Sequence, residues 1–220
     1  MDAIECIRTR QSIRKFMQDT VPAEKLLSVI ETARWSPSYK NSQPWEVVLV
    51  SGSRKEELTK MLSDLLESGE PPCPDIPEPL SWPPEIDARI ADLMKKRSEL
   101  TGMDLTSPEI RRKSKLANFA FYRAPHGIFI FQDGALKEWS ILDLGMFCQS
   151  LMLAAHASGL GTVPQAFLTD YSRQTKEFLG IPAGKRLCLG MSIGYPDMAS
   201  PANQFRTDRV KTETILRVIE

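Results

Sequence analysis

Residues 141–164 read ILDLGMFCQSLMLAAHASGLGTVP, and this stretch decides how the rest of the chain folds. From residue 140 to residue 158, apolar side chains cover nearly every face of a predicted helix. A helix that is apolar all round is buried on all sides, so we expect it at the centre of the fold. In a domain of this size, a subunit interface would supply part of that burial. Gly159 and Gly161 end the helix and let the backbone approach a flat ligand, or they form an ordinary helix cap and turn.

The segments on either side of this helix alternate between strand and helix patterns. Short apolar runs predict strands at 46–51, 127–132 and 187–194. Amphipathic spacing predicts helices at 2–9, 22–35, 53–66, 85–100 and 108–118. Because the strands are few and separated by helices, we expect an α+β fold, with a mixed central sheet surrounded by helices. The whole chain, 1–220, is expected to form one domain.

Composition excludes several classes of function. Hydrophobic residues make up 42% of the 220 residues, which is enough for one core. Lysine plus arginine and aspartate plus glutamate each number 28, so neither nucleic acid nor a membrane is an expected partner. The four cysteines form no CxxC pair and the charged N-terminus carries no signal-peptide pattern, which favours a reducing cytoplasm. The two histidines lack ligand-spaced partners, so we expect neither a metal site nor a His-based triad.

Basic residues gather at two places that lie far apart in the sequence. Arg10 and Arg14 flank Ser12 just after the first predicted helix. Guanidinium groups bind phosphate through two parallel hydrogen bonds, and a serine hydroxyl adds a short donor, so this group suits an anion. Arg206 and Arg209, in the non-helical tail, would complete the same phosphate site. Solvated basic turns are the alternative interpretation of both groups.

A stiff polar loop leads into the first predicted strand. Residues 36–45 read SPSYKNSQPW, in which two prolines restrict the backbone. Asn41 and Gln43 each offer amide donors and an acceptor. Such a loop delivers amide groups to a fixed place, although an ordinary connection between helix and strand is the simpler interpretation.

Taken in order, five motifs resemble the nitroreductase family of FMN-dependent oxidoreductases. They are RTRQSIRKF (8–16), SPSYKNSQPWEVVLV (36–50), DLGMFCQSLMLAAHASGLGTVP (143–164), LGIPAGKRLCLGMSIGYPD (179–197) and NQFRTDR (203–209). The resemblance covers most of the chain and implies an intertwined homodimer with two FMN sites at the subunit interface. It also implies that 67–118 is an insert near the active site, similar to the longer insert of nitroaromatic-reducing members.

The resemblance further implies which residues hold the flavin. Those expected at its phosphate, ribityl chain and N1/O2 edge are Arg10, Gln11, Ser12 and Arg14. Those expected from the loop of the partner subunit are Pro37, Ser38, Asn41 and Gln43. Those expected beside the isoalloxazine, with backbone N–H groups near N5 and O4, are Pro164, Gln165 and Ala166. The C-terminal phosphate clamp would be Arg206 and Arg209. Tyr39, Phe119 and Phe121 are candidates for lining the acceptor pocket, or they are plain core and surface aromatics.

The activity that the resemblance implies is ping-pong hydride transfer from NADH or NADPH, through FMN, to a small acceptor such as a nitroaromatic or a quinone. Because the flavin itself is reactive, no protein acid or base is expected to be catalytic. Other chemistry on the same scaffold stays open, namely enoate reduction, reductive dehalogenation or flavin fragmentation. A flavin-binding module without turnover is the alternative from a different class.

Overall fold

A four-stranded sheet forms the centre of the molecule, which we describe from a computed structural model of residues 1–220. In the order β1-β2-β4-β3, the strands are β1 (Glu46–Ser51), β2 (His126–Asp133), β4 (Lys185–Gly194) and β3 (Gly161–Gln165). All pairings between these strands are antiparallel, and the one parallel pairing is an isolated bridge between Ser12 and Thr162. The α+β class is confirmed, whereas the expected mixed sheet is corrected to an antiparallel one. Side chains alternate in the same way in both kinds of strand, so the short apolar runs did not reveal strand direction.

Strand β3 was not predicted, because we interpreted its sequence as a glycine-containing turn. Pro164 lacks an N–H group and therefore argues against a central strand. The structure resolves this conflict by placing β3 at the edge of the sheet, where its only strand partner is β4. An edge strand tolerates proline because its outer side needs no continuous ladder of hydrogen bonds.

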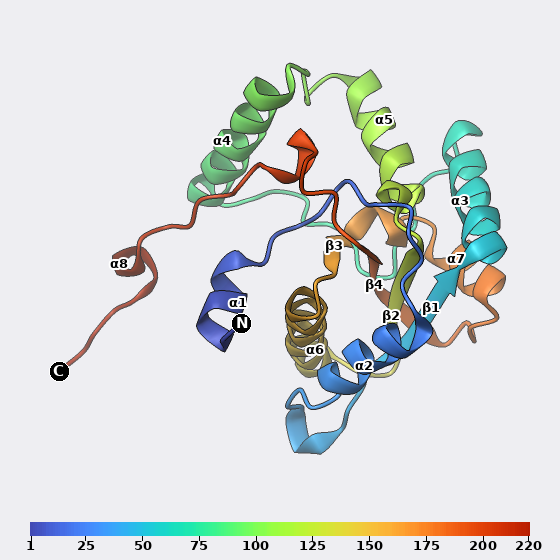
Figure 1. The fold of residues 1–220 in the computed structure, drawn as a ribbon, viewed down its shortest axis with the longest axis horizontal. Helices are drawn as coiled ribbons and strands as arrows, with labels where there is room; N and C mark the ends of the chain where they lie inside the picture. Colours follow the sequence, from blue (N-terminus) through green and yellow to red (C-terminus); the bar gives the residue numbers. More distant parts are fainter.

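Hydrophobic layers cover both faces of the sheet (Figure 1). On one face, Ile128 and Ile130 of β2 pack with α2 (Ala23–Ala33) and α6 (Glu138–Ala157). On the other face, Phe129 and Phe131 pack with α3 (Gly52–Glu67), α5 (Pro108–Phe119) and α7 (Ser172–Leu179). Successive side chains of a strand point to opposite faces, so β2, buried along its length up to Asp133, contributes to both layers.

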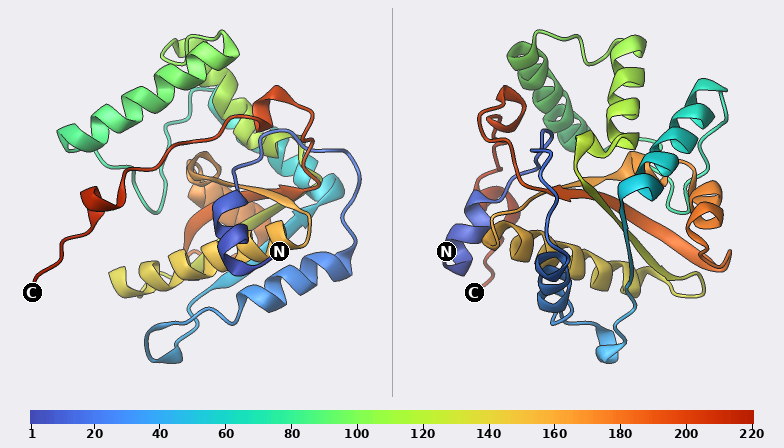
Figure 2. Two further views of the ribbon diagram at one scale, coloured as in Figure 1. Left: turned by 60° about the vertical axis from the view of Figure 1, so that its left-hand side comes forward. Right: turned by 45° about the vertical axis from the view of Figure 1, so that its right-hand side comes forward.

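The long insert between α3 and β2 is anchored at its base and projects at its far end. The Asp75 carboxylate accepts hydrogen bonds from Lys176 Nζ at 2.9 Å and from the Leu187 backbone N–H at 2.7 Å. Beyond this anchor, α4 (Pro84–Thr101) contains no buried residue and stands away from the sheet (Figures 1 and 2). Prolines in the first turns of α4 and α5 suit those positions because the first helical N–H groups have no partner within the helix.

Apolar side chains of several outer elements are left exposed in the single chain. On α6, Leu142 is 59% exposed and Trp139 is 66% exposed, so the helix is not buried on all sides within one subunit. By length and composition α6 could cross a bilayer, but it packs against α2 and β3 inside the fold. Exposed apolar residues also lie on α1 (Ala3–Thr9) and in the tail with α8 (Thr212–Ile215), which extends away from the body (Figure 1). Short 3₁₀ helices complete the fold at Tyr39–Asn41, Phe121–Arg123, Ala166–Thr169 and Pro201–Asn203.

The sheet makes one close contact that a substitution can test. A Cβ atom placed on Gly190 of β4 would overlap the side chain of Leu168, close to the backbone. We expect Gly190→Ala to lower the free energy of unfolding by about 1–3 kcal/mol, because overpacking forces neighbouring groups apart. The measurement is urea unfolding followed by circular dichroism. Gly184→Ala, at a position with open space around the new Cβ atom, is the matched control. Equal midpoints for the two variants would contradict this view of the packing.

Candidate functional site

Two adjoining cavities lie where the chain leaves α1 and passes the start of β3. The first has a volume of about 320 Å³ and includes Thr9, His156 and Gly161 in its lining. The second has a volume of about 580 Å³ and extends between the N-terminal segment, α4 and the C-terminal tail. Residues Arg10, Gln11 and Arg206 line both cavities. Elements from both ends of the chain and from the insert therefore meet at one place.

Six arginines and no acidic residue line the larger cavity. They are Arg8, Arg10, Arg14, Arg97, Arg206 and Arg209. Burial lowers the pKa of Arg10, and the neighbouring charges of Arg209 and Arg206 lower it further. Like charges in a cleft repel one another, and an anion bound among them would relieve that repulsion. A phosphate group fits this donor set, because several guanidinium groups can bind its oxygens at once.

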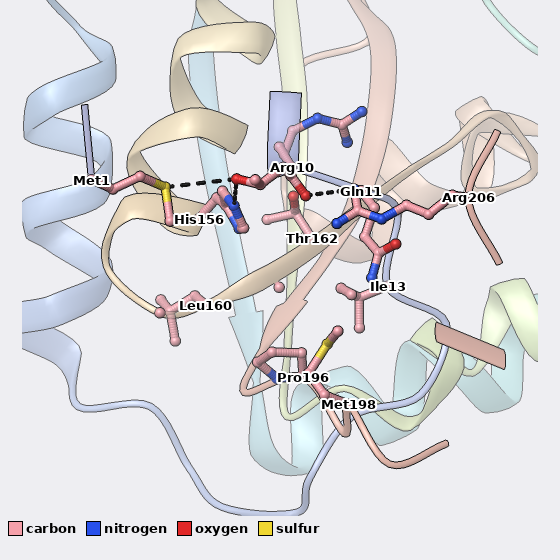
Figure 3. A pocket seen from close by; sticks show the side chains of 13 residues that line it. Met1, Arg10, Gln11, Ile13, His156, Leu160, Thr162, Pro196, Met198 and Arg206 are labelled. Carbon is pink, nitrogen blue, oxygen red and sulfur yellow. Dashed lines mark hydrogen bonds between the residues drawn. The ribbon is translucent and has the colours of Figure 1, made fainter. Parts of the chain in front are cut away.

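A single buried side chain joins the tail to the N-terminal segment. Asn203, which is only 1% exposed, accepts a hydrogen bond from the Arg14 backbone N–H at 2.7 Å. Its amide nitrogen donates to the carbonyl oxygens of Lys15 at 2.7 Å and Asp197 at 2.9 Å. Its own backbone carbonyl accepts from Gln11 Nε2 at 2.7 Å. These bonds hold the tail beside residues 10–15, and Arg206 then donates to the Thr9 carbonyl at 2.7 Å, as Figure 3 shows.

An unpaired acceptor points to a ligand with hydroxyl groups. The Oε1 atom of Gln11 is buried and has no hydrogen-bond partner, although the residue lines both cavities. A buried polar atom without a partner is costly, and a donor from a bound molecule would satisfy it. Ser12 lies next to it and pairs with Thr162 at the edge of the sheet. A phosphate ester with a polyhydroxyl chain, such as the ribityl phosphate of a flavin nucleotide, therefore fits these residues.

Known proteins are similar to this chain in sequence and in fold. The family profile described as "Nitroreductase family" matches residues 7–195 of the chain. The chain belongs to the nitroreductase family. It is 29% identical to a 4-nitrobenzoate reductase of Pseudomonas putida, over 92% of this chain and 89% of the relative. It is 31% identical to nitroreductase NfnB of Mycolicibacterium smegmatis, over 92% of this chain and 86% of the relative.

A solved structure extends the likeness to the whole architecture. The crystal structure of the FMN-dependent nitroreductase NfnB from Mycobacterium smegmatis, in complex with NADPH, matches with a TM-score of 0.94 at 28% identity. The match covers 99% of this chain and 98% of that one. The nitroreductase fold expected from the sequence is therefore confirmed.

Within this nitroreductase, the residues predicted to hold the flavin fall into separated groups. Arg10, Gln11, Ser12, Arg14, Arg206 and Arg209 line the larger cavity together. The loop that carries Pro37, Ser38, Asn41 and Gln43 lines neither cavity and is tied to α6 instead, where the Tyr39 N–H donates to Asp143 at 3.0 Å. One subunit does not bring the loop and the arginines together.

The third predicted group, Pro164, Gln165 and Ala166, lies at the end of β3 and the start of the following 3₁₀ helix. The Gln165 side chain is 2% exposed, and its Nε2 atom donates to Asn118 Oδ1 at 3.1 Å. Its Oε1 atom accepts from the Ser192 hydroxyl. Both ends of the side chain are therefore occupied inside the protein, and none of the three residues lines either cavity within one subunit.

Two of the three predicted acceptor-pocket residues do not lie in a pocket. Phe119 and Phe121 are 0% exposed and belong to the core layer beneath α3 and α5, which supports the alternative interpretation of them as plain core aromatics. Phe119 ends α5 and Phe121 begins the following 3₁₀ helix, and burial of both rings stabilises the fold. Tyr39 is 56% exposed and stacks on Trp139, with ring centroids 5.7 Å apart.

Sequence reasoning also missed residues that shape the site. Asn203 was quoted only as part of a tail motif, and Arg97 was hidden in a charged helix of the insert. Neither has a local pattern that marks it, because each acquires its role from contacts with residues distant in the sequence.

Asn203 gives a test of how the site is held together. We expect Asn203→Ala to lower the free energy of unfolding by about 2–3 kcal/mol, since a buried N–H group and two carbonyl oxygens lose their partners. Asn203→Asp keeps the acceptor for Arg14 but sets a buried carboxylate oxygen against the carbonyl oxygens of Lys15 and Asp197, so it should destabilise the protein at least as much. Urea unfolding measures both, with Glu99→Ala, an exposed residue of α4, as control. A midpoint for Asn203→Ala equal to that of the control would show that these bonds do not stabilise the site.

Proposed function

We propose that this chain is an FMN-dependent nitroreductase that moves a hydride from NADH or NADPH to a small acceptor, such as a nitroaromatic or a quinone. The observation that carries the proposal is the acid-free cavity with its six arginines, beside the edge of the sheet, in a chain of this family. The FMN and NADPH of the structurally similar NfnB support the same cofactor and donor here.

Different residues of the larger cavity would bind different parts of the cofactor. Arg10, Arg206 and Arg209 would bind the phosphate, which carries about two negative charges at neutral pH. Gln11 and Ser12 would bind the ribityl hydroxyls, and this satisfies the unpaired Gln11 Oε1 atom. The backbone of Pro164, Gln165 and Ala166 would flank the ring system. Arg14 forms no ion pair within the chain, so its charge is available to offset negative charge on the reduced ring.

Bound FMN supplies the redox chemistry, taking a hydride from the nicotinamide and giving two electrons to the acceptor in separate half-reactions of a ping-pong cycle. The chain contributes binding and orientation, and no side chain is assigned as a catalytic acid or base. The natural acceptor is a small molecule. A reducing, cytoplasmic location is part of the proposal, and the four free thiols support it.

The direct test is the colour of the purified protein. It should be yellow, with about one FMN per subunit, and should bleach when NADH or NADPH is added without oxygen. A nitroarene or a quinone should then restore the oxidised spectrum. Colourless protein that takes up no added FMN would overturn the proposal, and yellow protein that neither donor bleaches would favour a binding module without turnover.

Removing one arginine should weaken cofactor binding selectively. We expect Arg10→Ala to weaken FMN binding by about 1.5–3 kcal/mol, roughly tenfold to more than a hundredfold, because one charge-assisted contact is lost. Fluorescence titration of apoprotein with FMN measures the dissociation constant. The control is Arg173→Ala, an exposed arginine on α7. If both variants bind FMN as the unchanged protein does, Arg10 is not a ligand.

We propose that the enzyme is an intertwined homodimer in which each subunit completes the site of the other. The exposed apolar face of α6 and the exposed apolar residues of the tail support an interface, since such surfaces are costly in water. The second support is the loop with Ser38, Asn41 and Gln43, whose amides and hydroxyl are distant from the arginines of the same chain.

A charge placed on α6 should separate the subunits. We expect Leu142→Glu to convert the dimer to monomer and to reduce bound FMN strongly, because a carboxylate would be buried in an apolar interface. Size-exclusion chromatography with light scattering gives the mass, and absorbance gives the flavin content. Leu80→Glu is the matched control, since Leu80 lies fully exposed in the insert. A Leu142→Glu protein that remains dimeric with full FMN would place the interface elsewhere.

A further inference from the structure

Five of the six arginines of the larger cavity form two neighbouring groups. Burial and the charges of Arg209 and Arg206 lower the pKa of Arg10. The pKa of Arg97 is lowered by burial and by the charge of Arg14, while Tyr122 raises it slightly. Arg97 forms no ion pair with any acidic residue of the chain. The cavity therefore holds a second concentration of unneutralised positive charge, at Arg14 and Arg97.

The insert holds Arg97 in position over the cavity. Arg97 and Leu93, one helical turn apart on α4, both line it. The adjacent residue, Lys96, forms ion pairs with Asp208 of the tail at 2.8 Å and with Asp92 at 2.9 Å. Figures 1 and 2 show α4 alongside the tail. Because these acids pair with Lys96, the charge of Arg97 is left for a ligand.

A chain of hydrogen bonds leads from the sheet to a tyrosine hydroxyl near Arg97. Ser192 donates to Gln165, Gln165 donates to Asn118 at 3.1 Å, and Asn118 Nδ2 donates to the Tyr122 hydroxyl oxygen at 3.0 Å. Each donor in this chain uses its hydrogen on the next residue, so the hydrogen of the Tyr122 hydroxyl is free to be donated outward.

The backbone fixes this tyrosine in an unusual conformation. Phe121, Tyr122 and Arg123 have φ angles of 52°, 50° and 63°, in the left-handed region that residues other than glycine rarely adopt. Such conformations persist where surrounding contacts enforce them, and here the buried Phe121 and the bond from Asn118 do so. The position of the Tyr122 side chain is therefore determined by the fold.

We propose that Arg97, which lines the cavity beside Arg14, forms with the nearby Tyr122 hydroxyl a subsite that binds a carboxylate group of the acceptor. The inference rests on the proposed function, in which Arg10, Arg206 and Arg209 neutralise the cofactor phosphate, Arg14 serves the ring edge, and the charge of Arg97 is left in excess. A guanidinium group and a hydroxyl together match the two oxygens of a carboxylate. The preferred acceptors are then aromatic nitro compounds that carry a carboxylate on the ring.

The dinucleotide donor also carries anionic oxygens, but these fit the subsite less well. The nearest phosphate of NADH or NADPH is separated from the reacting nicotinamide by a ribose. A ring carboxylate lies only a few bonds from the reacting nitro group of the acceptor. A subsite next to Arg14, the residue assigned to the ring edge, is therefore within reach of the acceptor carboxylate.

Equilibrium binding to the oxidised holoenzyme tests the subsite without turnover. Benzoate and its neutral isostere benzamide are titrated, and the perturbation of flavin absorbance gives each dissociation constant. We expect Arg97→Gln to weaken benzoate binding at least tenfold and benzamide binding less than twofold. Tyr122→Phe should weaken benzoate binding severalfold. Lys95→Gln removes a positive charge from the same helix outside the cavity, and it should leave both constants unchanged.

Steady-state kinetics with 4-nitrobenzoate and 4-nitrobenzamide give the second readout. The ratio of the two kcat/KM values should fall at least tenfold in Arg97→Gln, mainly through KM for the carboxylate.

Equal losses for the charged and neutral compounds would overturn the subsite, as would loss of FMN from Arg97→Gln. A change in the ratio of kcat/KM for NADPH to kcat/KM for NADH, without a change in benzoate binding, would reassign Arg97 to the donor and would also overturn the subsite. If the unchanged protein held no flavin, the proposed function would fail; a yellow, bleachable enzyme indifferent to the carboxylate would overturn the subsite alone.

Discussion

The hydrogen bonds of Asn203 are the interaction on which the rest of the site depends. They connect residues 11–15, directly after α1, with the tail near the end of the chain. That connection fixes the start of the tail, and the bond from Arg206 to the Thr9 carbonyl and the ion pair of Lys96 with Asp208 then hold its arginines near Arg10 and Arg14. A neutral, buried amide is suited to this role, because it satisfies backbone groups on both segments and adds no charge to a region that is already strongly positive.

The concentration of arginines has an energetic consequence for the empty site. Mutual repulsion and burial both disfavour the charged form of Arg10, so the ligand-free arrangement is costly. A ligand that binds only the folded protein stabilises it by an amount that grows with its concentration relative to the dissociation constant. Folding and loading of the cofactor are thus linked, and the same charges that attract the phosphate make its presence important for stability.

Local sequence patterns predicted the parts of the molecule that short-range chemistry determines. The α+β class and the long apolar helix follow from side-chain type and spacing, whereas the grouping of Arg10 and Arg14 with Arg206 and Arg209 came from the family resemblance. Strand β3 was missed because Pro164 is compatible with a strand only at an edge, which is a property of the whole sheet. For Phe119 and Phe121 the sequence left core and pocket open, since an aromatic side chain looks the same in both. Arg97 and Asn203 depend on partners more than a hundred residues away or on another element of the fold, so their roles required the tertiary structure.

Pro164 of β3 also limits the pairing of this sheet edge with strands of other chains. A free sheet edge with a continuous row of N–H and C=O groups can recruit a strand from another chain and begin aggregation. At Pro164 that row lacks one donor, and at Thr162 it is already occupied by the bridge to Ser12. This rim of the sheet is therefore a poor template for intermolecular strand addition while newly made chains are still concentrated and unassembled.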